Sequence, residues 1–306
     1  MMDRAMSDHM LGGHVAFLVG AGRSGTTLLY KLLCLHPQVA YISNYENRLG
    51  RFAEGLAGRI VSQRPEAKVR AWFNHGGNAY FIRRPWLQKL FPTPHEGESV
   101  FRDCGVPLFP ARDYRLEESK AEVLRMRFER IRRRSGAAVF VSKRTANNRR
   151  IPLLSSIFPD ARYVHLVRDG REVTQSLSTV EWWNGHKVWW DGRTPLEMER
   201  AGEGRLSICA RNWVRELQEL RQQLAQVERD NVLELRFEDL LRDPMRELER
   251  VVRFLGLEFP PGYRETIAAL GLGPVRDKWQ SDWNESQLAQ VLDEARPMLR
   301  ELGYIA

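Results

Sequence analysis

Four short apolar runs along the chain predict buried β-strands. They are rich in β-branched and aromatic residues and lack a strict alternation of apolar and polar positions, which is typical of parallel strands covered on both faces. The runs are residues 15–19, 138–142, 163–167 and 232–236. Because such strands need cover on both sides, the pattern predicts helices above and below a central parallel sheet.

Segments with apolar residues at roughly helical spacing separate the predicted strands. One helix is expected to end before His36-Pro37 and another at Gly256, because proline and glycine commonly follow helix ends. The predicted helices cover residues 26–35, 171–177, 206–227 and 245–255. Strands that alternate with helices favour a layered α/β fold.

Two stretches interrupt this alternation. Residues 72–115 contain closely spaced Gly, Pro and Asn, and residues 181–204 hold four tryptophans among Gly and Pro. Long ordered loops often form lids or binding walls, so we expect two insertions carried by one scaffold. With no internal repeat and no low-complexity linker, the sequence predicts a single domain over residues 1–306.

The formal net charge of +8 indicates an anionic partner, such as nucleic acid, an acidic membrane surface or a phosphorylated cofactor. Lys and Arg are scattered and form no recognisable nucleic-acid-binding motif, so no nucleic-acid partner is expected. The three cysteines follow no metal-ligand spacing, which fits a reducing compartment and buried side chains. No segment approaches the ~20 apolar residues of a membrane span, so the expected location is cytoplasmic. The oligomeric state stays open.

A glycine-rich turn follows the first predicted strand and leads into a helix. Backbone N–H groups of such a turn, together with the helix N-terminus, favour a bound anion. The spacing of Gly20 and Gly25 matches a P-loop, G-x-x-x-x-G-K-[ST], but Thr26 stands where the lysine should be. That lysine serves β- and γ-phosphates together with Mg²⁺, so its absence argues against an ordinary ATPase or kinase. The turn predicts a P-loop-like three-layer α/β fold with a central parallel sheet flanked by helices.

A second anion motif lies at the end of the predicted strand 163–167. Arg168 follows this strand, and the next helix carries Ser176. Ligands of open α/β sheets bind beyond the carboxyl ends of the strands, where Gly20 and Arg168 both fall. Asp169 is predicted to cap the helix.

Together these motifs resemble those of sulfotransferases that use 3′-phosphoadenosine 5′-phosphosulfate (PAPS), and most closely a bacterial branch that also resembles tyrosylprotein sulfotransferases. The matching segments occur in order along nearly the whole chain: 22–29, 36–37, 142–143, 158–161, 167–177, 235–240 with 243–244, 254–257, 278–279 and 302–304.

The resemblance implies a role for each matched residue. Arg168 and Ser176 would bind the 3′-phosphate, which distinguishes PAPS from ATP. Lys143 would lie near the transferring sulfuryl group and stabilise the developing negative charge. Arg276 and Lys278 would close over the nucleotide, and no metal is expected. The 5′-phosphosulfate would be held by Gly22, Arg23, Ser24, Gly25, Thr26 and Thr27.

Transfer to a hydroxyl needs a base within hydrogen-bond reach of its proton. Glu46 resembles the glutamate that serves as base in related enzymes; its alternative role is an ion pair with Arg48 or Arg51. His75 and His186 are the reserve candidates. The four tryptophans of the second insertion, 182, 183, 189 and 190, could stack on a sugar or aromatic acceptor or form a hydrophobic lid.

The predicted function is transfer of a sulfuryl group from PAPS to a hydroxyl by in-line displacement. The partners are PAPS and a hydroxyl-bearing acceptor, which could be a small molecule, a glycan or a lipid. Two alternatives from other classes remain at this stage. One is a P-loop kinase that uses ATP, and the other is a basic nucleic-acid-binding protein.

Overall fold

The computed structural model describes residues 15–50, 54–55, 59, 64–74, 91–274 and 277–306. Five parallel strands form one sheet in the order β2-β3-β1-β4-β5. The strands are β1 (Val15–Val19), β2 (Val39–Ala40), β3 (Val139–Lys143), β4 (Arg162–Val167) and β5 (Val232–Arg236). The four strands predicted from apolar runs are confirmed. The two-residue strand β2 was not predicted, because it is too short to show a pattern.

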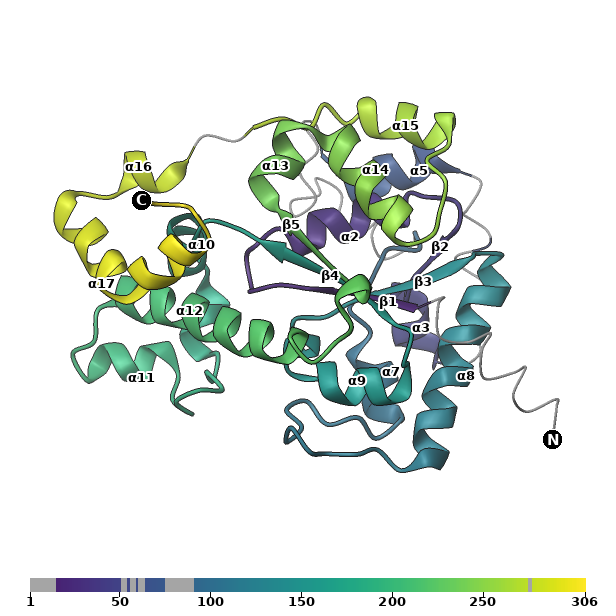
Figure 1. Cartoon of the computed structure of the whole chain (residues 1–306), viewed down its shortest axis with the longest axis horizontal. Helices are drawn as coiled ribbons and strands as arrows, with labels where there is room; N and C mark the ends of the chain where they lie inside the picture. Colours follow the sequence, from purple (N-terminus) through teal and green to yellow (C-terminus); the bar gives the residue numbers. More distant parts are fainter. Residues whose placement is uncertain (1–14, 51–53, 56–58, 60–63, 75–90, 275–276) are drawn as a thin grey trace.

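Helices cover both faces of the sheet (Figure 1). The upper layer in this view contains α2 (Thr26–Cys34), α5 (Pro65–Trp72), α13 (Phe237–Arg242), α14 (Pro244–Phe254) and α15 (Pro261–Ala268). The lower layer contains α3 (Asn44–Leu49), α7 (Glu98–Asp103), α8 (Glu118–Ser135) and α9 (Ile151–Ile157). The predicted three-layer α/β architecture is therefore confirmed.

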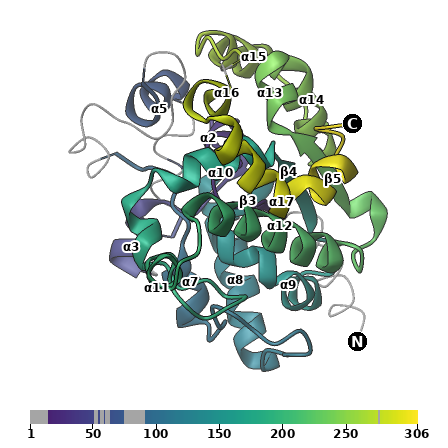
Figure 2. The same ribbon diagram turned by 90° about the vertical axis from the view of Figure 1, so that its left-hand side faces the viewer.

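A further group of helices gathers beyond the carboxyl ends of the strands, and Figure 2 shows it from that side. It contains α10 (Gly170–Ser178), α11 (Pro195–Arg200), α12 (Arg205–Leu224), α16 (Lys278–Asp282) and α17 (Glu285–Glu301). Short 3₁₀ turns complete the connections: η2 (Thr145–Arg149), η3 (Glu181–Gly185) and η4 (Arg229–Asn231). The predicted helices in 26–35, 171–177, 206–227 and 245–255 are confirmed, with ends that differ by a few residues.

Successive side chains of β1 pack alternately on the two faces of the sheet. Ala16 and Leu18 pack in one buried apolar cluster, whereas Phe17 and Val19 pack in another on the opposite face. Successive side chains of a strand point to opposite faces, so a strand buried on both sides must be apolar throughout. This explains why its sequence lacks strict alternation.

The two predicted insertions contain ordered structure where the chain is described. Residues 91–115 include α7, and residues 181–204 include η3 and α11, while 75–90 lie outside the described residues. All three cysteines are free and buried, as expected from their spacing. Across the described residues, no helix is both long and apolar enough to cross a membrane. The single-domain assignment to 1–306 and the cytoplasmic location stay predictions.

Candidate active site

The turn between β1 and α2 leaves a helix N-terminus without a cap. Gly25 precedes α2 with φ 92°, and no side chain bonds to the first N–H groups of the helix. The Leu28 N–H bonds to the Gly25 carbonyl oxygen (2.9 Å), and the N–H groups before it have no acceptor inside the helix. Ser24 is fully buried, and its hydroxyl oxygen has no hydrogen-bond partner. An anion seated here would satisfy both the helix N-terminus and this hydroxyl.

Asn148 holds the start of the turn. Its side-chain amide donates to the Gly20 carbonyl oxygen (2.9 Å) and accepts from the Gly20 N–H (3.1 Å). Arg23 has φ 71° and is the one non-glycine residue with positive φ among the described residues. Positive φ is uncommon outside glycine and points to a functional constraint on the turn.

The structure brings the two anion motifs together. The Arg23 Nε donates to the Ser176 hydroxyl (2.9 Å), and the Arg168 guanidinium donates to the Arg23 carbonyl oxygen (3.1 Å). The same guanidinium lies 4.7 Å from the centre of the Phe237 ring and pairs with Glu172 at 2.9 Å. As predicted, Asp169 caps α10 by accepting from the Arg171 N–H (2.8 Å).

Lys143 ends β3 at the same edge of the sheet. Its side chain is nearly buried, and its ammonium lies 2.5 Å from one carboxylate oxygen of Glu96. The other oxygen of Glu96 lies 2.5 Å from the Arg144 guanidinium. Burial alone would raise the pKa of Glu96, but Lys143 and Arg144 together hold it below its usual value, so this group is ionised at neutral pH.

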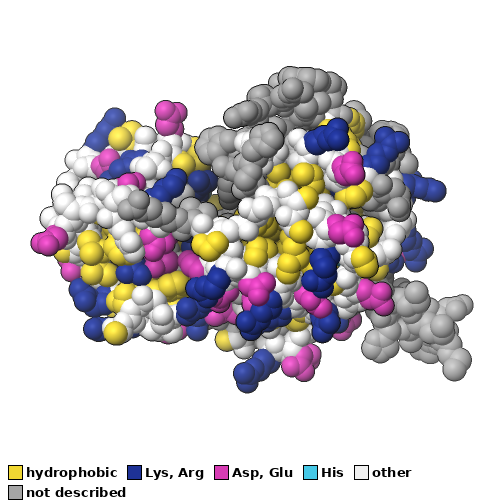
Figure 3. Space-filling view, turned by 90° about the horizontal axis from the view of Figure 1, so that it is seen from above, with side chains coloured by type: hydrophobic (Ala, Val, Ile, Leu, Met, Phe, Trp, Pro, Cys, Tyr) yellow, Lys and Arg dark blue, Asp and Glu magenta, His cyan; other side chains and the backbone are white. Residues whose placement is uncertain are grey.

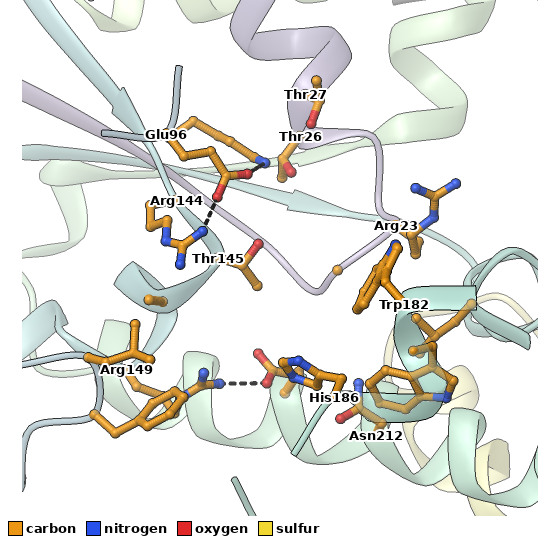
Figure 4. Close-up of a pocket in the computed structure, with 18 residues that line it drawn as sticks. Arg23, Thr26, Thr27, Glu96, Arg144, Thr145, Arg149, Trp182, His186 and Asn212 are labelled. Atoms are coloured by element: carbon orange, nitrogen blue, oxygen red, sulfur yellow. Dashed lines mark hydrogen bonds and ion pairs between the residues drawn. The ribbon is translucent and has the colours of Figure 1, made fainter. Parts of the chain in front are cut away.

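A cavity of about 430 Å³ opens beside the turn (Figure 4). Loop and strand-end residues line one side, α12 lines another, and aromatic side chains line a third. Its lining comprises Gly22, Arg23, Thr26, Thr27, Glu96, Leu108, Phe109, Lys143, Arg144, Thr145, Ala146, Arg149, Leu177, Trp182, Trp183, His186, Asn212 and Glu216.

A second cavity, of about 250 Å³, is lined by Arg168 and Phe237. Leu241 and Pro274 give it further apolar surface. Its remaining lining residues are charged: Glu172, Glu238, Arg242 and Asp277. Arg168, which lines this second cavity, donates to Arg23, which lines the first, so this hydrogen bond connects the walls of the two cavities.

Glu46 is absent from both cavity linings. It is 2% exposed and forms the capping box of α3 with Ser43, whose backbone N–H donates to its carboxylate (2.7 Å). The Ser43 hydroxyl donates to the same oxygen, and the Gly55 N–H donates to the other (2.9 Å). Its role as a base stays a prediction. Arg51, His75 and Arg276 lie outside the described residues, as does the side chain of Arg48.

The four tryptophans divide between two roles. Trp182 and Trp183 line the larger cavity, where His186 stacks on Trp183 with ring centres 5.4 Å apart. Burial lowers the pKa of His186, which favours the neutral ring. The other two attach to residues of α12: Trp189 donates to Glu216 (2.6 Å) and Trp190 to Asn212 (3.0 Å).

Sequence reasoning missed several residues of the site. Arg144, Asn148 and Arg149 lie within seven residues of the end of the predicted strand 138–142, so their place beyond its carboxyl end was a usable signal. Glu96 carried no such signal, because it lies in an insertion whose path the local pattern does not reveal. His36 and His165 have structural partners, in the Glu258 carbonyl oxygen and the Glu234 carboxylate.

The fold and the paired anion motifs define a class of protein. A family model described as "Sulfotransferase family" matches residues 16–261, which is more than half of the chain. The chain therefore belongs to the sulfotransferase family. Membership favours sulfuryl transfer over the kinase and nucleic-acid-binding alternatives.

Particular relatives can also be named. The chain is 24% identical over 275 residues to the omega-hydroxy-beta-dihydromenaquinone-9 sulfotransferases Stf3 of Mycobacterium bovis and Mycobacterium tuberculosis. The match covers 83% of this chain and 66% of the length of these relatives.

Two solved structures share the fold. Sulfotransferase STF9 from Mycobacterium avium aligns with a TM-score of 0.54 and 14% identity, over 95% of this chain and 80% of that one. The sulfotransferase domain from the curacin biosynthetic pathway aligns with a TM-score of 0.50 and 17% identity, over 93% of this chain and 97% of that one. These likenesses confirm the predicted P-loop-like fold.

Proposed function

We propose that this protein transfers a sulfuryl group from PAPS to a hydroxyl of an acceptor by in-line displacement. The carrying observation is the uncapped N-terminus of α2 beside an unpartnered Ser24 hydroxyl, with Arg23 of the turn and Thr26 of α2 lining a cavity together with Lys143. A helix N-terminus with nearby cations is the arrangement that binds a phosphate-like dianion without a metal.

The donor-binding residues are those predicted from sequence. Gly22, Arg23, Ser24, Gly25, Thr26 and Thr27 hold the 5′-phosphosulfate through backbone N–H groups, hydroxyls and one guanidinium. Arg168 and Ser176 bind the 3′-phosphate, and the second cavity, beside the Phe237 ring, receives the adenine. The hydrogen bonds of Arg23 with both Ser176 and Arg168 support this proposal, because they join the turn after β1 to the residues assigned to the 3′-phosphate. When bound, PAPS supplies a sulfuryl group attached to a stable phosphate leaving group.

Lys143 stabilises the charge that develops on the leaving 5′-phosphate. Its side chain is nearly buried, so water screens its charge little, and the Glu96 carboxylate 2.5 Å away offsets part of that charge. Arg144 lies on the same side of the cavity and adds positive charge there.

The acceptor presents its hydroxyl from an apolar body. Leu108, Phe109 and Trp182 are 41%, 48% and 56% exposed, and all three line the larger cavity. Exposed apolar side chains that gather at a cavity mark a binding surface for an apolar ligand. This favours a lipid or an aromatic small molecule over a glycan. The name of the mycobacterial relatives refers to a menaquinone derivative, which agrees with this class.

Basic side chains on the face seen in Figure 3 are dispersed among acidic ones rather than gathered in one patch. A protein that binds nucleic acid by charge needs a continuous basic surface. This distribution supports a nucleotide donor, rather than nucleic acid, as the anionic partner.

Calorimetry with 3′,5′-adenosine bisphosphate tests the donor site. The Arg168→Ala variant should bind about ten- to a hundred-fold more weakly, because hydrogen bonds to a charged group contribute roughly 1.5–3 kcal/mol. Arg246→Ala, a change at an exposed side chain of α14, is the matched control and should bind like the wild type. Absence of binding by the wild type, or binding of Mg²⁺-ATP in its place, would overturn the proposed function.

A further inference from the structure

Sulfuryl transfer to a hydroxyl requires a group that removes the hydroxyl proton at the reacting end of the cavity. Two carboxylates are found among the described residues that line the larger cavity, Glu96 and Glu216. Their surroundings differ, and the difference decides which of them can accept a proton.

Glu216 accepts hydrogen bonds from three other residues of the site. Its oxygens accept from the Arg149 guanidinium (2.5 Å), the Trp189 indole N–H (2.6 Å) and the Asn148 amide (3.1 Å). Asn148 in turn holds the Gly20 backbone at the start of the anion turn. The side chain of Glu216 is 7% exposed, so an acceptor hydroxyl has little access to it, and its role is structural.

The Glu46 carboxylate also accepts hydrogen bonds through both of its oxygens. Its two oxygens accept from Ser43 and Gly55 in the α3 cap, and its side chain lines neither cavity. An acceptor hydroxyl inside the cavity therefore has no direct path to this carboxylate.

Glu96 is paired as well, but it is the most exposed of the three carboxylates. One third of its side chain is exposed, it lines the cavity together with Thr26, and its partners are the cations Lys143 and Arg144. These cations keep it ionised, and each oxygen retains lone pairs that can receive a proton. Figure 4 shows it on the side of α2, whereas His186 lies on the opposite side near Asn212.

The backbone around Glu96 is fixed in place. The His95 N–H donates to the Ile42 carbonyl oxygen (2.7 Å), and Pro94 forms a β-bridge with Ser43. Gly97 has φ 66°, and a Cβ there would lie 2.4 Å from the Ile42 side chain. A base must be held within hydrogen-bond reach of its proton, and this anchoring supplies the required rigidity.

We infer that Glu96 is the general base of the reaction, a role that rests on the proposed function. Its carboxylate takes the acceptor proton while the acceptor oxygen bonds to sulfur. The bond between sulfur and the 5′-phosphate oxygen breaks, and its electron pair leaves on the phosphate beside Lys143. Glu96 then returns the proton to water. The reaction is balanced: the alcohol and PAPS give the sulfate ester, 3′,5′-adenosine bisphosphate and one proton.

The test follows transfer of ³⁵S from PAPS to 2-naphthol, to the more acidic 4-nitrophenol and to water. Glu96→Gln should lower kcat with 2-naphthol and with water by roughly 100- to 10,000-fold, the usual contribution of a general base. The loss should be smaller with 4-nitrophenol, because its proton needs less help to leave. The Kd for 3′,5′-adenosine bisphosphate should stay within about three-fold of the wild-type value, which corresponds to a change in binding free energy of less than about 0.7 kcal/mol.

Glu129→Gln is the matched control. Glu129 also pairs with two cations, Arg132 (2.7 Å) and Arg133 (2.5 Å), but it does not line the cavity, so this variant should keep kcat within a few-fold of the wild type. Circular dichroism of each variant checks the fold.

Near-normal turnover of Glu96→Gln overturns the assignment, and a large loss in Glu46→Gln alone transfers the role to Glu46. A loss of bisphosphate affinity in Glu96→Gln that accounts for its lost turnover would also overturn it, since Glu96 would then only position Lys143. Failure of the wild type to bind the bisphosphate instead overturns the proposed function itself.

Discussion

Gly25 shows how one residue can govern the donor site. Its φ of 92° lies in the left-handed region, and a Cβ added there would lie 2.3 Å from the Phe237 ring. Glycine is therefore required twice, once by the backbone conformation and once by the close approach of an aromatic ring. The motif spacing identified this glycine from sequence, but the contact with Phe237 was invisible, since the two residues are far apart along the chain.

The Gly25→Ala variant should lose both stability and donor affinity. The left-handed backbone alone costs about 1–2 kcal/mol in an alanine, and the ring of Phe237 must also move. Thermal unfolding and bisphosphate calorimetry measure the two effects. Gly262→Ala is the control, because a Cβ there meets nothing within 4 Å and its φ is ordinary. A Gly25→Ala protein as stable as the control would contradict this account.

At the scale of elements, the β-strands were easier to predict than the contacts between helices. Buried parallel strands leave continuous apolar runs, and all four such runs are strands. The packing of α5 against α2 has no comparable signal, because it includes a buried lysine. The Lys68 ammonium donates to the Cys34 carbonyl oxygen (2.9 Å) and lies 5.5 Å from the centre of the Trp72 ring.

The buried position of Lys68 predicts that its contribution to the free energy of unfolding increases at alkaline pH. Burial lowers the pKa of Lys68 from 10.5 to about 8 in the folded protein. Between these two pH values the unfolded chain binds more protons than the folded one, so the contribution of Lys68 to the free energy of unfolding rises with pH. Urea denaturation of the wild type and Lys68→Met should therefore show a difference that shifts in favour of the wild type between about pH 8 and 10, by up to about 3 kcal/mol.

The comparison with Lys68→Met is needed because other groups titrate in the same range. Burial raises the pKa of Tyr41 and Cys34, and such groups lower stability as the pH passes their unfolded values. Taking the difference between the two proteins removes these contributions, except for the part that Lys68 itself causes by lowering the pKa of Cys34. Lys120→Met, at an exposed position of α8, should show no such pH dependence relative to the wild type. A pH-independent difference for Lys68→Met would contradict the burial argument.

At the scale of the whole molecule, the site is assembled from segments that no local pattern connects. The turn after β1, the end of β3 and the start of α10 could be placed together from sequence, because parallel strands end at one edge of the sheet. Glu96, Phe109 and Trp182 reach the same cavity from the two insertions. Their approach depends on tertiary packing, which explains why the donor side was predicted in detail and the acceptor side was not.

The apolar side chains at the cavity should therefore control the acceptor and leave the donor unaffected. Trp182→Ala should raise KM for 2-naphthol about ten-fold or more, since burying a large apolar side chain against a ligand contributes about 1.5–3 kcal/mol. Bisphosphate affinity should not change. Met126→Ala is the matched control: Met126 is 46% exposed, but it lies on α8 and does not line the cavity. If Trp182→Ala left KM unchanged, or if wild-type protein preferred polar sugars to apolar phenols, the acceptor would bind through other surfaces. If KM rises only for apolar acceptors and bisphosphate affinity is unchanged, the apolar side chains at the cavity bind the acceptor. A general loss of structure would weaken donor binding as well.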